Sequence, residues 1–281
     1  MNEAPAFPYR WGLTDTTLIA ETLSSRIFKV RLPDGTPAVV KDLKPFDDVE
    51  DELRGAHLLD WRRGEGLVRL IDMDGNRMLL EYAGETMLSE IVDDKGDHAA
   101  TEIAAETMAR LHSPSDHPVP SGLQPLRRRF ADLFSKAKAE HEAGRTSLYL
   151  EAAGIAERLL CDQRDVRPLH GDLHHENIMN GTRGWLAIDP KGVLGDPGFD
   201  AANIFYNPLD RDDLCLGPDR IAGMAELFSR TLGQSPRRLL DYAVAYGCLS
   251  AAWHAGDGNG EDERRELAVA AAIGKVRDLS F

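Results

Sequence analysis

The sequence predicts an α+β protein with two lobes, a small β-rich N-terminal lobe and a larger helical C-terminal lobe. β-rich runs separated by turn residues fill the chain before Gly84, and helical periodicity dominates after it. The length of 281 residues exceeds one average domain and falls short of three, which suits two closely packed lobes. We therefore expect residues 1–83 to form the first lobe and residues 84–281 to form the second.

The first three strands are predicted from β-rich runs and the turns between them. Leu18-Ile19-Ala20 and residues 27–32 are rich in β-forming residues, and a short polar loop separates the two runs. Pro33-Asp34-Gly35 is a strong turn signal, so residues 37–41 follow as the next strand.

A helix and a second hairpin complete the predicted first lobe. Residues 47–63 carry acidic residues at the start and arginines at the end, as the helix dipole favours, and Gly64 ends the helix. Residues 68–73 and 77–82 form a hairpin around Asp74-Gly75. The predicted order is strand, strand, strand, helix, strand, strand.

The second lobe is predicted to be mostly helical. Residues 101–112 place their apolar side chains on one face of a helix. The stretch 167–197 is rich in loops and contains two very short strands, at 178–179 and 185–188, and Asp200 then looks like the N-cap of another helix. Further helices are predicted over residues 124–143, 147–161, 218–232, 236–254 and 260–279.

Composition excludes several classes of protein. Hydrophobic residues make up 42% of the chain and charged residues 28%, which is typical of a soluble globular protein. No apolar run approaches the roughly 20 residues that span a bilayer, and the N-terminus lacks the basic and apolar pattern of a signal peptide. The three cysteines are far apart and odd in number, so we expect a reducing cytoplasm and no disulfide framework.

The net charge of −14 argues against a nucleic-acid partner, because the chain has no long run of lysine or arginine. Two explanations of the acidity stay open. It serves the solubility of the surface, or it creates an acidic cleft that attracts a cationic substrate. Charge alone does not choose between them.

The densest group of chemically active residues is the segment 170–177, His-Gly-Asp-Leu-His-His-Glu-Asn. Asp172 is followed five positions later by Asn177, then by a short strand, and then by Asp189 at the end of another strand. Phosphoryl transfer needs an aspartate that accepts the proton of the attacking hydroxyl, and amide and carboxylate oxygens that hold Mg²⁺ on the phosphates. The pattern predicts a kinase with Asp172 as the base and with Asn177 and Asp189 as metal ligands.

These motifs, with Ile188-Asp189-Pro190, resemble those of the aminoglycoside phosphotransferase family, which shares the protein-kinase fold. The runs 169–179 and 184–192 are similar to the streptomycin 6-kinase branch, which is grouped with the hydroxyurea phosphotransferases. The resemblance implies a bilobal protein-kinase-like fold, ATP and Mg²⁺ as cofactors, and transfer of the γ-phosphate to an aminoglycoside, specifically to the 6-hydroxyl of streptomycin. It extends over nearly the whole chain, through residues 32–41, 79–85 and 246–253.

On this frame, Lys41 would end the third strand and pair with the α- and β-phosphates of ATP. A glutamate on the following helix should orient it. Glu52 has Ala56 and Leu59 at an inward-facing spacing, and we expect it to be the partner, with Glu50 as the competitor.

The adenine ring is expected at the connector between the lobes, which Glu81-Tyr82-Ala83 matches. The backbone carbonyl of Glu81 and the N–H of Ala83 would pair with the ring, and Val39 and Ile188 would sandwich it. Where kinases have a glycine-rich loop over the phosphates, this chain has Ser24 and Ser25 inside residues 21–26. Without glycine the backbone cannot approach the phosphates as closely, so each serine either contacts them or forms a plain tight turn.

Several polar residues near the catalytic segment are expected to have supporting roles. The resemblance implies that His170 supports the loop from behind and that Asp200 braces it through backbone hydrogen bonds. His174 and His175 are expected to pack within the loop or face solvent.

The acceptor is expected to be a small cationic alcohol that Asp172 faces. The guanidinium groups of streptomycin call for carboxylates and for an aromatic surface, so Asp213, Trp253 and Asp257 are our candidates for substrate binding. The alternative acceptors are hydroxyurea or another small amino- or guanidino-bearing alcohol. Other acidic candidates are Asp210, Asp212 and Glu261.

Two rival classes remain to be tested. The cluster of His170, Asp172, His174 and His175 suits a zinc-dependent metallohydrolase by residue type, although Asn177 would then have no role. A pseudokinase that only binds ATP would require the loss of the base or of a metal ligand. For the kinase we expect a monomer that has no nucleic-acid or membrane partner.

Overall fold

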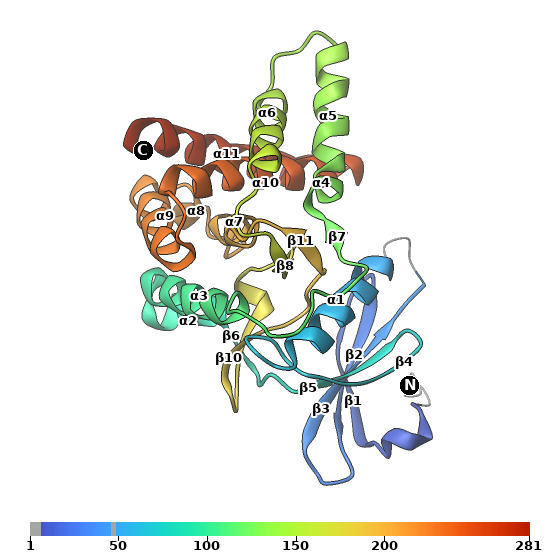
Figure 1. Cartoon of the computed structure of the whole chain (residues 1–281). Coiled ribbons are helices and arrows are strands. Elements are labelled where there is room, and N and C mark those ends of the chain that lie inside the picture. The colour runs from blue at the N-terminus through green and yellow to red at the C-terminus, as the bar shows by residue number, and fades with distance from the viewer. Residues whose placement is uncertain (1–6, 46–48) are drawn as a thin grey trace.

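The computed structural model describes residues 7–45 and 49–281, so residues 47 and 48 of the first predicted helix lie outside the described residues. It confirms the α+β class, with a β-rich lobe at the N-terminal end and a helical lobe beyond it (Figure 1). The C-terminus lies on the helical lobe. None of the described helices is long and apolar enough to cross a membrane.

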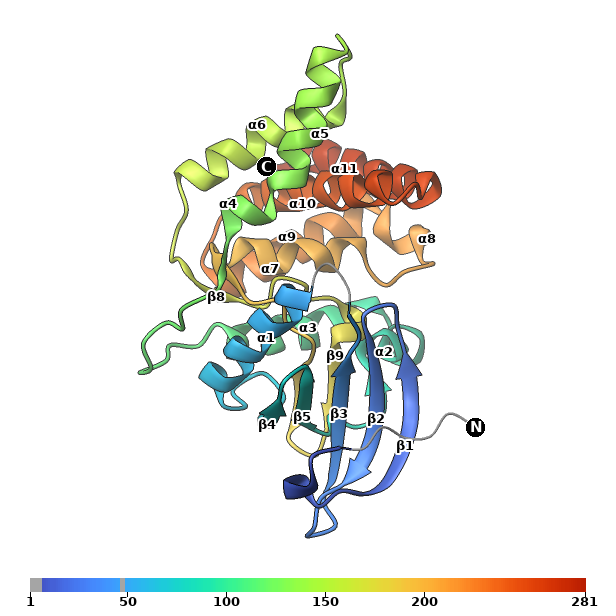
Figure 2. The same ribbon diagram turned by 90° about the vertical axis from the view of Figure 1, so that its right-hand side faces the viewer.

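The N-terminal lobe is a five-stranded sheet in the order β1-β2-β3-β5-β4, and every neighbouring pair is antiparallel (Figure 2). The helix α1 (Val49–Arg62) packs on one face of this sheet. A short 3₁₀ turn (Tyr9–Trp11) precedes the sheet, and the strands are β1 (Thr14–Glu21), β2 (Ser25–Arg31), β3 (Pro37–Leu43), β4 (Leu70–Asp74) and β5 (Arg77–Glu81).

Alternation along β3 decides which side chains reach the space between the lobes. Val40 packs with Trp11 and Phe28 on the outer face of the sheet. Successive side chains of a strand point to opposite faces, so Lys41 points to the other face, where α1 lies. The period of two therefore aims the lysine at the helix that carries its predicted partner.

The C-terminal lobe is built around α10 (Pro236–Gly256), which lies alongside α11 (Gly260–Ser280) (Figure 1). The other helices of this lobe are α2 (Leu88–Lys95), α3 (Asp97–Leu111), α4 (Leu126–Arg129), α5 (Ala131–Glu142), α6 (Leu148–Cys161), α7 (Gly198–Ala202), α8 (Asp212–Cys215) and α9 (Pro218–Leu232). Two 3₁₀ turns span His175–Asn177 and Asn203–Tyr206.

Two small sheets support the loops between the helices. One has the order β10-β9-β6 and is antiparallel, and in the other β11 pairs with β7 in parallel and with β8 in antiparallel fashion. The strands are β6 (Thr86–Met87), β9 (Ile178–Gly181), β10 (Gly184–Ala187), β7 (Gln124–Pro125), β8 (Arg167–Leu169) and β11 (Val193–Gly195).

The prediction of one long helix over residues 124–143 is wrong. Gln124 and Pro125 form β7, and the amide of Gln124 donates to the carbonyl of Gly192. Pro125 then caps α4, and a break at Phe130 separates α4 from α5. A proline has no N–H and a fixed φ, so it begins a helix well but cannot lie inside one.

The prediction that Asp200 caps a helix is also wrong. The helix α7 starts two residues earlier, at Gly198, with Pro197 at its N-cap, so Asp200 lies inside it. Its carboxylate therefore does not cap α7. It instead accepts hydrogen bonds from the loop that carries Asp172, as described below. The other long helices, α6, α9, α10 and α11, agree with the sequence prediction to within a few residues.

We predict that Gly247→Ala destabilises the helical lobe by ~1–3 kcal/mol, the usual cost of overpacking a core. A Cβ at Gly247 would overlap the Tyr206 ring and hydroxyl, and that hydroxyl donates to the carbonyl of Ala243 at 2.8 Å. Urea unfolding measures the change. Gly223→Ala on α9 is the matched control, because a Cβ there meets no heavy atom within 4 Å. Equal midpoints for the two variants would contradict the prediction.

Candidate active site

A closed ring of ion pairs lies between the sheet, α1 and the loop after β10. Lys41 Nζ lies 2.5 Å from Glu52 Oε2 and also contacts Asp189 Oδ1. Lys191 Nζ lies 2.9 Å from Glu52 Oε1 and 3.2 Å from Asp189 Oδ2. The choice of Glu52 over Glu50 as the partner of Lys41 is confirmed, because the Glu50 side chain is exposed and pairs with Arg54.

The charges of this ring stabilise one another. Burial by itself would raise the pKa of Asp189, but Lys41 and Lys191 outweigh that effect and hold the pKa below its ordinary range. Burial would lower the pKa of Lys191, and the Asp189 and Glu52 carboxylates instead raise it above the ordinary lysine value. Asp189 and Lys191 are therefore charged at neutral pH, as phosphate and metal binding require.

The backbone at Asp189 is unusual. Its φ is +59°, a left-handed conformation that aspartate tolerates better than most residues. Strained backbone of this kind persists where the surrounding structure holds it. Here β10 ends two residues before Asp189, and Lys191 N donates to the carbonyl of His170 at 2.7 Å two residues after it.

The loop that carries Asp172 is held from behind by Asp200. Both Asp200 oxygens accept backbone N–H groups, from His170 at 2.8 Å and from Gly171 at 2.8 Å, and His112 Nε2 lies 3.2 Å away. The predicted brace is confirmed. Burial would raise the pKa of Asp200, but His112, His170 and the backbone N–H groups outweigh it, so the pKa lies below its ordinary value.

His170 has the supporting role that the sequence predicts. It is buried, its Nε2 lies 2.8 Å from the carbonyl of Ile188, and its Nδ1 accepts the N–H of Asp172 at 3.2 Å. Both ring nitrogens are thus engaged within the protein. Among the residues that the structure describes, no three His, Cys, Asp or Glu side chains are placed to hold a metal ion, and the metallohydrolase alternative has no geometric support.

Asp172 is positioned by two asparagines. Asn177 Nδ2 donates to the backbone carbonyl of Asp172 at 2.9 Å, and Asn203 Nδ2 donates to its side-chain Oδ1 at 3.1 Å. The sequence prediction missed Asn203. The available signal was its spacing, three residues after Asp200, which places both side chains on one face of a helical turn.

The predicted metal ligands fit Mg²⁺ by donor chemistry. Asn177 donates to Asp172 through its amide nitrogen, so this hydrogen bond does not use its Oδ1, which is the atom that could bind a metal ion. Asp189 is ionised and lies one residue beyond Ile188, whose N–H donates to the carbonyl of Asn177 at 2.9 Å. The two residues thus lie on neighbouring backbone segments and offer a carboxylate and an amide oxygen, which are the hard donors that Mg²⁺ prefers.

The connector is fixed by an arginine from the other lobe. Arg183, in the β9–β10 turn, donates to both Glu81 oxygens at 2.7 and 2.6 Å and to the carbonyls of Gly64 and Leu67. The Glu81 side chain is therefore a structural tie, and the predicted adenine contact concerns its backbone. Ala83 is buried at this connector, and Val39 and Ile188 are half-buried, the latter packed against the large core of the helical lobe.

The two serines of the predicted phosphate loop differ. Ser24 lines the cleft between the lobes. Ser25 is buried in the turn, where its N–H donates to Thr22 Oγ1 at 3.0 Å and its carbonyl accepts the N–H of Thr22. The predicted nucleotide role of Ser25 is not supported, because the turn already uses its backbone groups.

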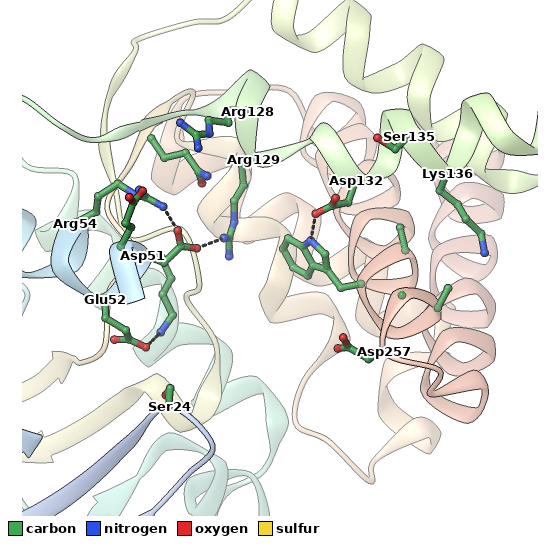
Figure 3. A pocket seen from close by; sticks show the side chains of 17 residues that line it. Ser24, Asp51, Glu52, Arg54, Arg128, Arg129, Asp132, Ser135, Lys136 and Asp257 are labelled. Atoms are coloured by element: carbon green, nitrogen blue, oxygen red, sulfur yellow. Dashed lines mark hydrogen bonds and ion pairs between the residues drawn. The ribbon is translucent and has the colours of Figure 1, made fainter. Parts of the chain in front are cut away.

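A cleft of about 1120 Å³ opens between α1, the α4–α5 segment and the end of α10 (Figure 3). Trp253 and Asp257, two of the residues predicted to bind the acceptor, line it. Asp213 does not, because it lies at the surface and pairs with Arg211 at 3.0 Å. The other acidic candidates, Asp210, Asp212 and Glu261, are also outside the lining, and so is Asp172 itself.

The lining is balanced in charge, so the hypothesis of an acidic cleft is wrong for these residues. Its carboxylates are matched by as many cationic side chains, which include Arg129 and Lys191. Arg129 lies over the Trp253 ring at 4.7 Å and pairs with Asp51 on α1 at 2.9 Å (Figure 3). Trp253 Nε1 donates to Asp132 at 2.9 Å. The sequence prediction missed Asp51, Arg129 and Asp132.

Comparisons with known proteins agree with this geometry. Residues 10–258 match the family model of aminoglycoside/hydroxyurea antibiotic resistance kinases. The chain is 42% identical over 254 residues to a streptomycin 3''-kinase of Klebsiella pneumoniae, which covers 89% of this chain and 91% of the relative. It is 31% identical to a streptomycin 6-kinase of Streptomyces glaucescens, over 94% of this chain and 86% of the relative.

A solved structure shares the fold. A thermostable mutant of an aminoglycoside phosphotransferase, in ternary complex with ADP and hygromycin B, aligns with a TM-score of 0.64 over 97% of both chains. The sequence identity is 17%, so this likeness speaks for the fold alone. The expected protein-kinase-like architecture is confirmed.

We predict that Asp200→Asn lowers the free energy of unfolding by about 2 kcal/mol at pH 7, because charged acceptors of buried N–H groups contribute about this much. The folded pKa of Asp200 is depressed, so its contribution is present above the unfolded pKa of ~3.9 and is lost as the pH falls through the folded pKa. The difference from wild type should therefore shrink below pH ~4.

Denaturant unfolding between pH 3 and 7 measures this effect. Asp219→Asn, an exposed position on α9, is the control and should stay within ~0.5 kcal/mol of wild type. A difference between Asp200→Asn and wild type that does not change with pH would contradict the assigned role.

Proposed function

The chain belongs to the aminoglycoside/hydroxyurea antibiotic resistance kinases, and we propose that it transfers the γ-phosphate of ATP to a hydroxyl of streptomycin. The observation that carries this proposal is the ion-pair ring of Lys41, Glu52, Lys191 and Asp189, which lies beside the Asp172 loop. A cluster of this kind binds and neutralises phosphate and metal charge, which is most of the catalysis in phosphoryl transfer.

In the proposed mechanism Asp172 acts as the base. Asn203 holds Oδ1 of its carboxylate, which leaves Oδ2 for the proton of the acceptor hydroxyl. The acceptor oxygen forms a bond to the γ-phosphorus while the bond from that phosphorus to the ADP oxygen breaks, and the electron pair leaves with ADP. Lys41 binds the α- and β-phosphates. Mg²⁺, held by Asn177 Oδ1 and Asp189, would neutralise charge on the phosphates.

We propose that the purine binds at the connector. The carbonyl of Glu81 and the N–H of Ala83 would pair with the adenine edge, and Val39 and Ile188 would cover its faces. The tie from Arg183 to Glu81 supports this assignment, because it holds the connector in one position relative to the β9–β10 hairpin that leads to Asp189. Ser24 would contribute to the loop over the phosphates.

The acceptor is proposed to occupy the cleft lined by Trp253 and Asp257. The structure already holds a guanidinium in this cleft, that of Arg129, over the ring of Trp253. The same chemistry suits the guanidinium groups of streptomycin, and Asp132 and Asp257 supply carboxylates nearby. The volume of about 1120 Å³ favours a large acceptor over hydroxyurea, since drug-sized ligands occupy ~300–1000 Å³.

The position of the phosphate is the open part of this proposal. The sequence motifs predict the 6-hydroxyl, on the ring that carries the guanidinium groups. The relative with 42% identity is a 3''-kinase and the 6-kinase reported above is 31% identical, so overall identity favours the 3''-hydroxyl. We retain streptomycin as the proposed substrate with both positions as candidates. A cytoplasmic, monomeric enzyme stays a prediction.

The first test is a steady-state assay with ATP and Mg²⁺ against streptomycin, other aminoglycosides and hydroxyurea. We expect turnover with streptomycin, and we expect Asp172→Asn to lower kcat by ~10²–10⁴-fold, the usual contribution of a general base. Asp219→Asn, which makes the same change of charge on the surface, should keep the wild-type rate. No turnover with any aminoglycoside would end the substrate proposal, and full activity in Asp172→Asn would end the mechanism.

The second test locates the phosphate on the product. Two-dimensional ¹H–³¹P NMR of the purified product should show coupling of phosphorus to one ring proton, either H6 of the guanidino ring or H3'' of the outer sugar. A single regioisomer is expected, because a fixed base such as Asp172 can address one hydroxyl of a bound acceptor. A mixture of comparable amounts would contradict a preorganised acceptor site.

A further inference from the structure

Lys191 is a second, half-buried lysine of the ion-pair ring, and the sequence motifs assign it no role. Its side chain is 16% exposed, and its ammonium contacts Glu52 at 2.9 Å and Asp189 at 3.2 Å. Lys191 and Glu52 also line the large cleft, whereas Lys41 and Asp189 are absent from its lining. Lys191 therefore lies where the nucleotide cluster meets the acceptor cleft.

Glu52 holds the two ammonium groups side by side. Its Oε2 accepts from Lys41 and its Oε1 accepts from Lys191, and its side chain is 7% exposed. A carboxylate that binds one cation on each oxygen fixes the distance between the cations. Because Lys41 is expected to bind phosphate, the neighbouring ammonium on the cleft side lies within reach of the same polyphosphate chain.

The main chain ties Lys191 to the catalytic loop. Its N–H donates to the carbonyl of His170 at 2.7 Å, and a Cβ at Gly171 would lie in van der Waals contact with Lys191 Cβ, at 3.5 Å. The base of the lysine side chain is thus fixed relative to Asp172. An ammonium that is fixed relative to both Glu52 and Asp172 can contact the phosphoryl group while that group is transferred from the nucleotide to the acceptor.

Charge balance indicates what the ammonium contacts once substrates bind. In the structure Asp189 accepts from Lys41 and from Lys191. A divalent cation at Asp189 would repel both ammonium groups, while the phosphates would offer them new anionic oxygens. Glu52 holds Lys191 in either case. The Lys191 ammonium therefore exchanges the Asp189 carboxylate for a phosphate oxygen while it keeps its contact with Glu52.

We propose that Lys191 is a second phosphate-binding residue, which binds the γ-phosphoryl oxygens from the acceptor side while Lys41 binds the α- and β-phosphates. The assignment rests on the proposed kinase function. As the acceptor oxygen bonds to phosphorus and the bond to ADP breaks, Lys191 keeps its protons and supplies hydrogen bonds and positive charge. The acceptor proton still goes to Asp172.

The test is nucleotide binding by calorimetry, with ADP and with the non-hydrolysable ATP analogue AMP-PNP, each with Mg²⁺ and again with EDTA. Wild type should bind AMP-PNP more tightly than ADP in both conditions. Lys191→Met should weaken AMP-PNP about 10-fold and leave ADP within about twofold, since one charge-assisted contact is lost. The kcat with streptomycin should fall ~100-fold or more.

Controls separate this role from a structural one. Lys138→Met removes the same charge from a side chain that is 75% exposed on α5, and it should leave both affinities unchanged. Glu52→Gln should weaken both nucleotides, because it loosens Lys41 as well. If Lys191→Met does not fold, judged by circular dichroism, Lys191→Gln replaces it, since its amide can still bond to Glu52.

The outcomes distinguish the two proposals. If Lys191→Met loses affinity for ADP and AMP-PNP equally, or keeps the wild-type preference, the γ-phosphate assignment is wrong while the kinase function stands. If wild type itself shows no preference for AMP-PNP, the assignment is also wrong. If wild type binds neither nucleotide, the proposed function and the assignment both fall.

Discussion

The contact between Lys41 and Glu52, 2.5 Å long and buried, is the interaction on which the site depends. A buried ammonium or carboxylate without a partner is costly, so the two side chains must meet if the sheet and α1 pack as they do. Their meeting fixes α1 against β3. Asp189 and Lys191 then complete the ring from the other lobe, so the pairing also sets how the lobes face each other.

A second buried carboxylate organises the loop that carries Asp172. Asp200 accepts the N–H groups of His170 and Gly171 and lies beside His112, and the same helical turn carries Asn203, which bonds to Asp172. The loop therefore owes its shape to Asp200 and Asn203, which lie outside it in the sequence. The two clusters are joined through the backbone, because Lys191 donates to the carbonyl of His170.

The sequence by itself determined the features that depend on local spacing. Turn residues and periodicity predicted the order of strands and helices, and the motif around Asp172, Asn177 and Asp189 predicted the chemistry. Glu52 could be preferred over Glu50 because helical periodicity tells which of two nearby side chains points inward. The inferences about strands, helices and Glu52 rest on the strand period of two and the helix period of 3.6, which are properties of the chain alone.

The tertiary structure alone decided which distant charges meet. Lys191, Asn203 and Arg129 were not identified from the sequence, because a charged residue at the surface and one in a buried ring look the same in sequence. For the same reason Asp213 was wrongly expected in the acceptor site, although it pairs with Arg211 outside the cleft. The partner of a long polar side chain depends on the packing of whole lobes, and local sequence carries no measure of that packing.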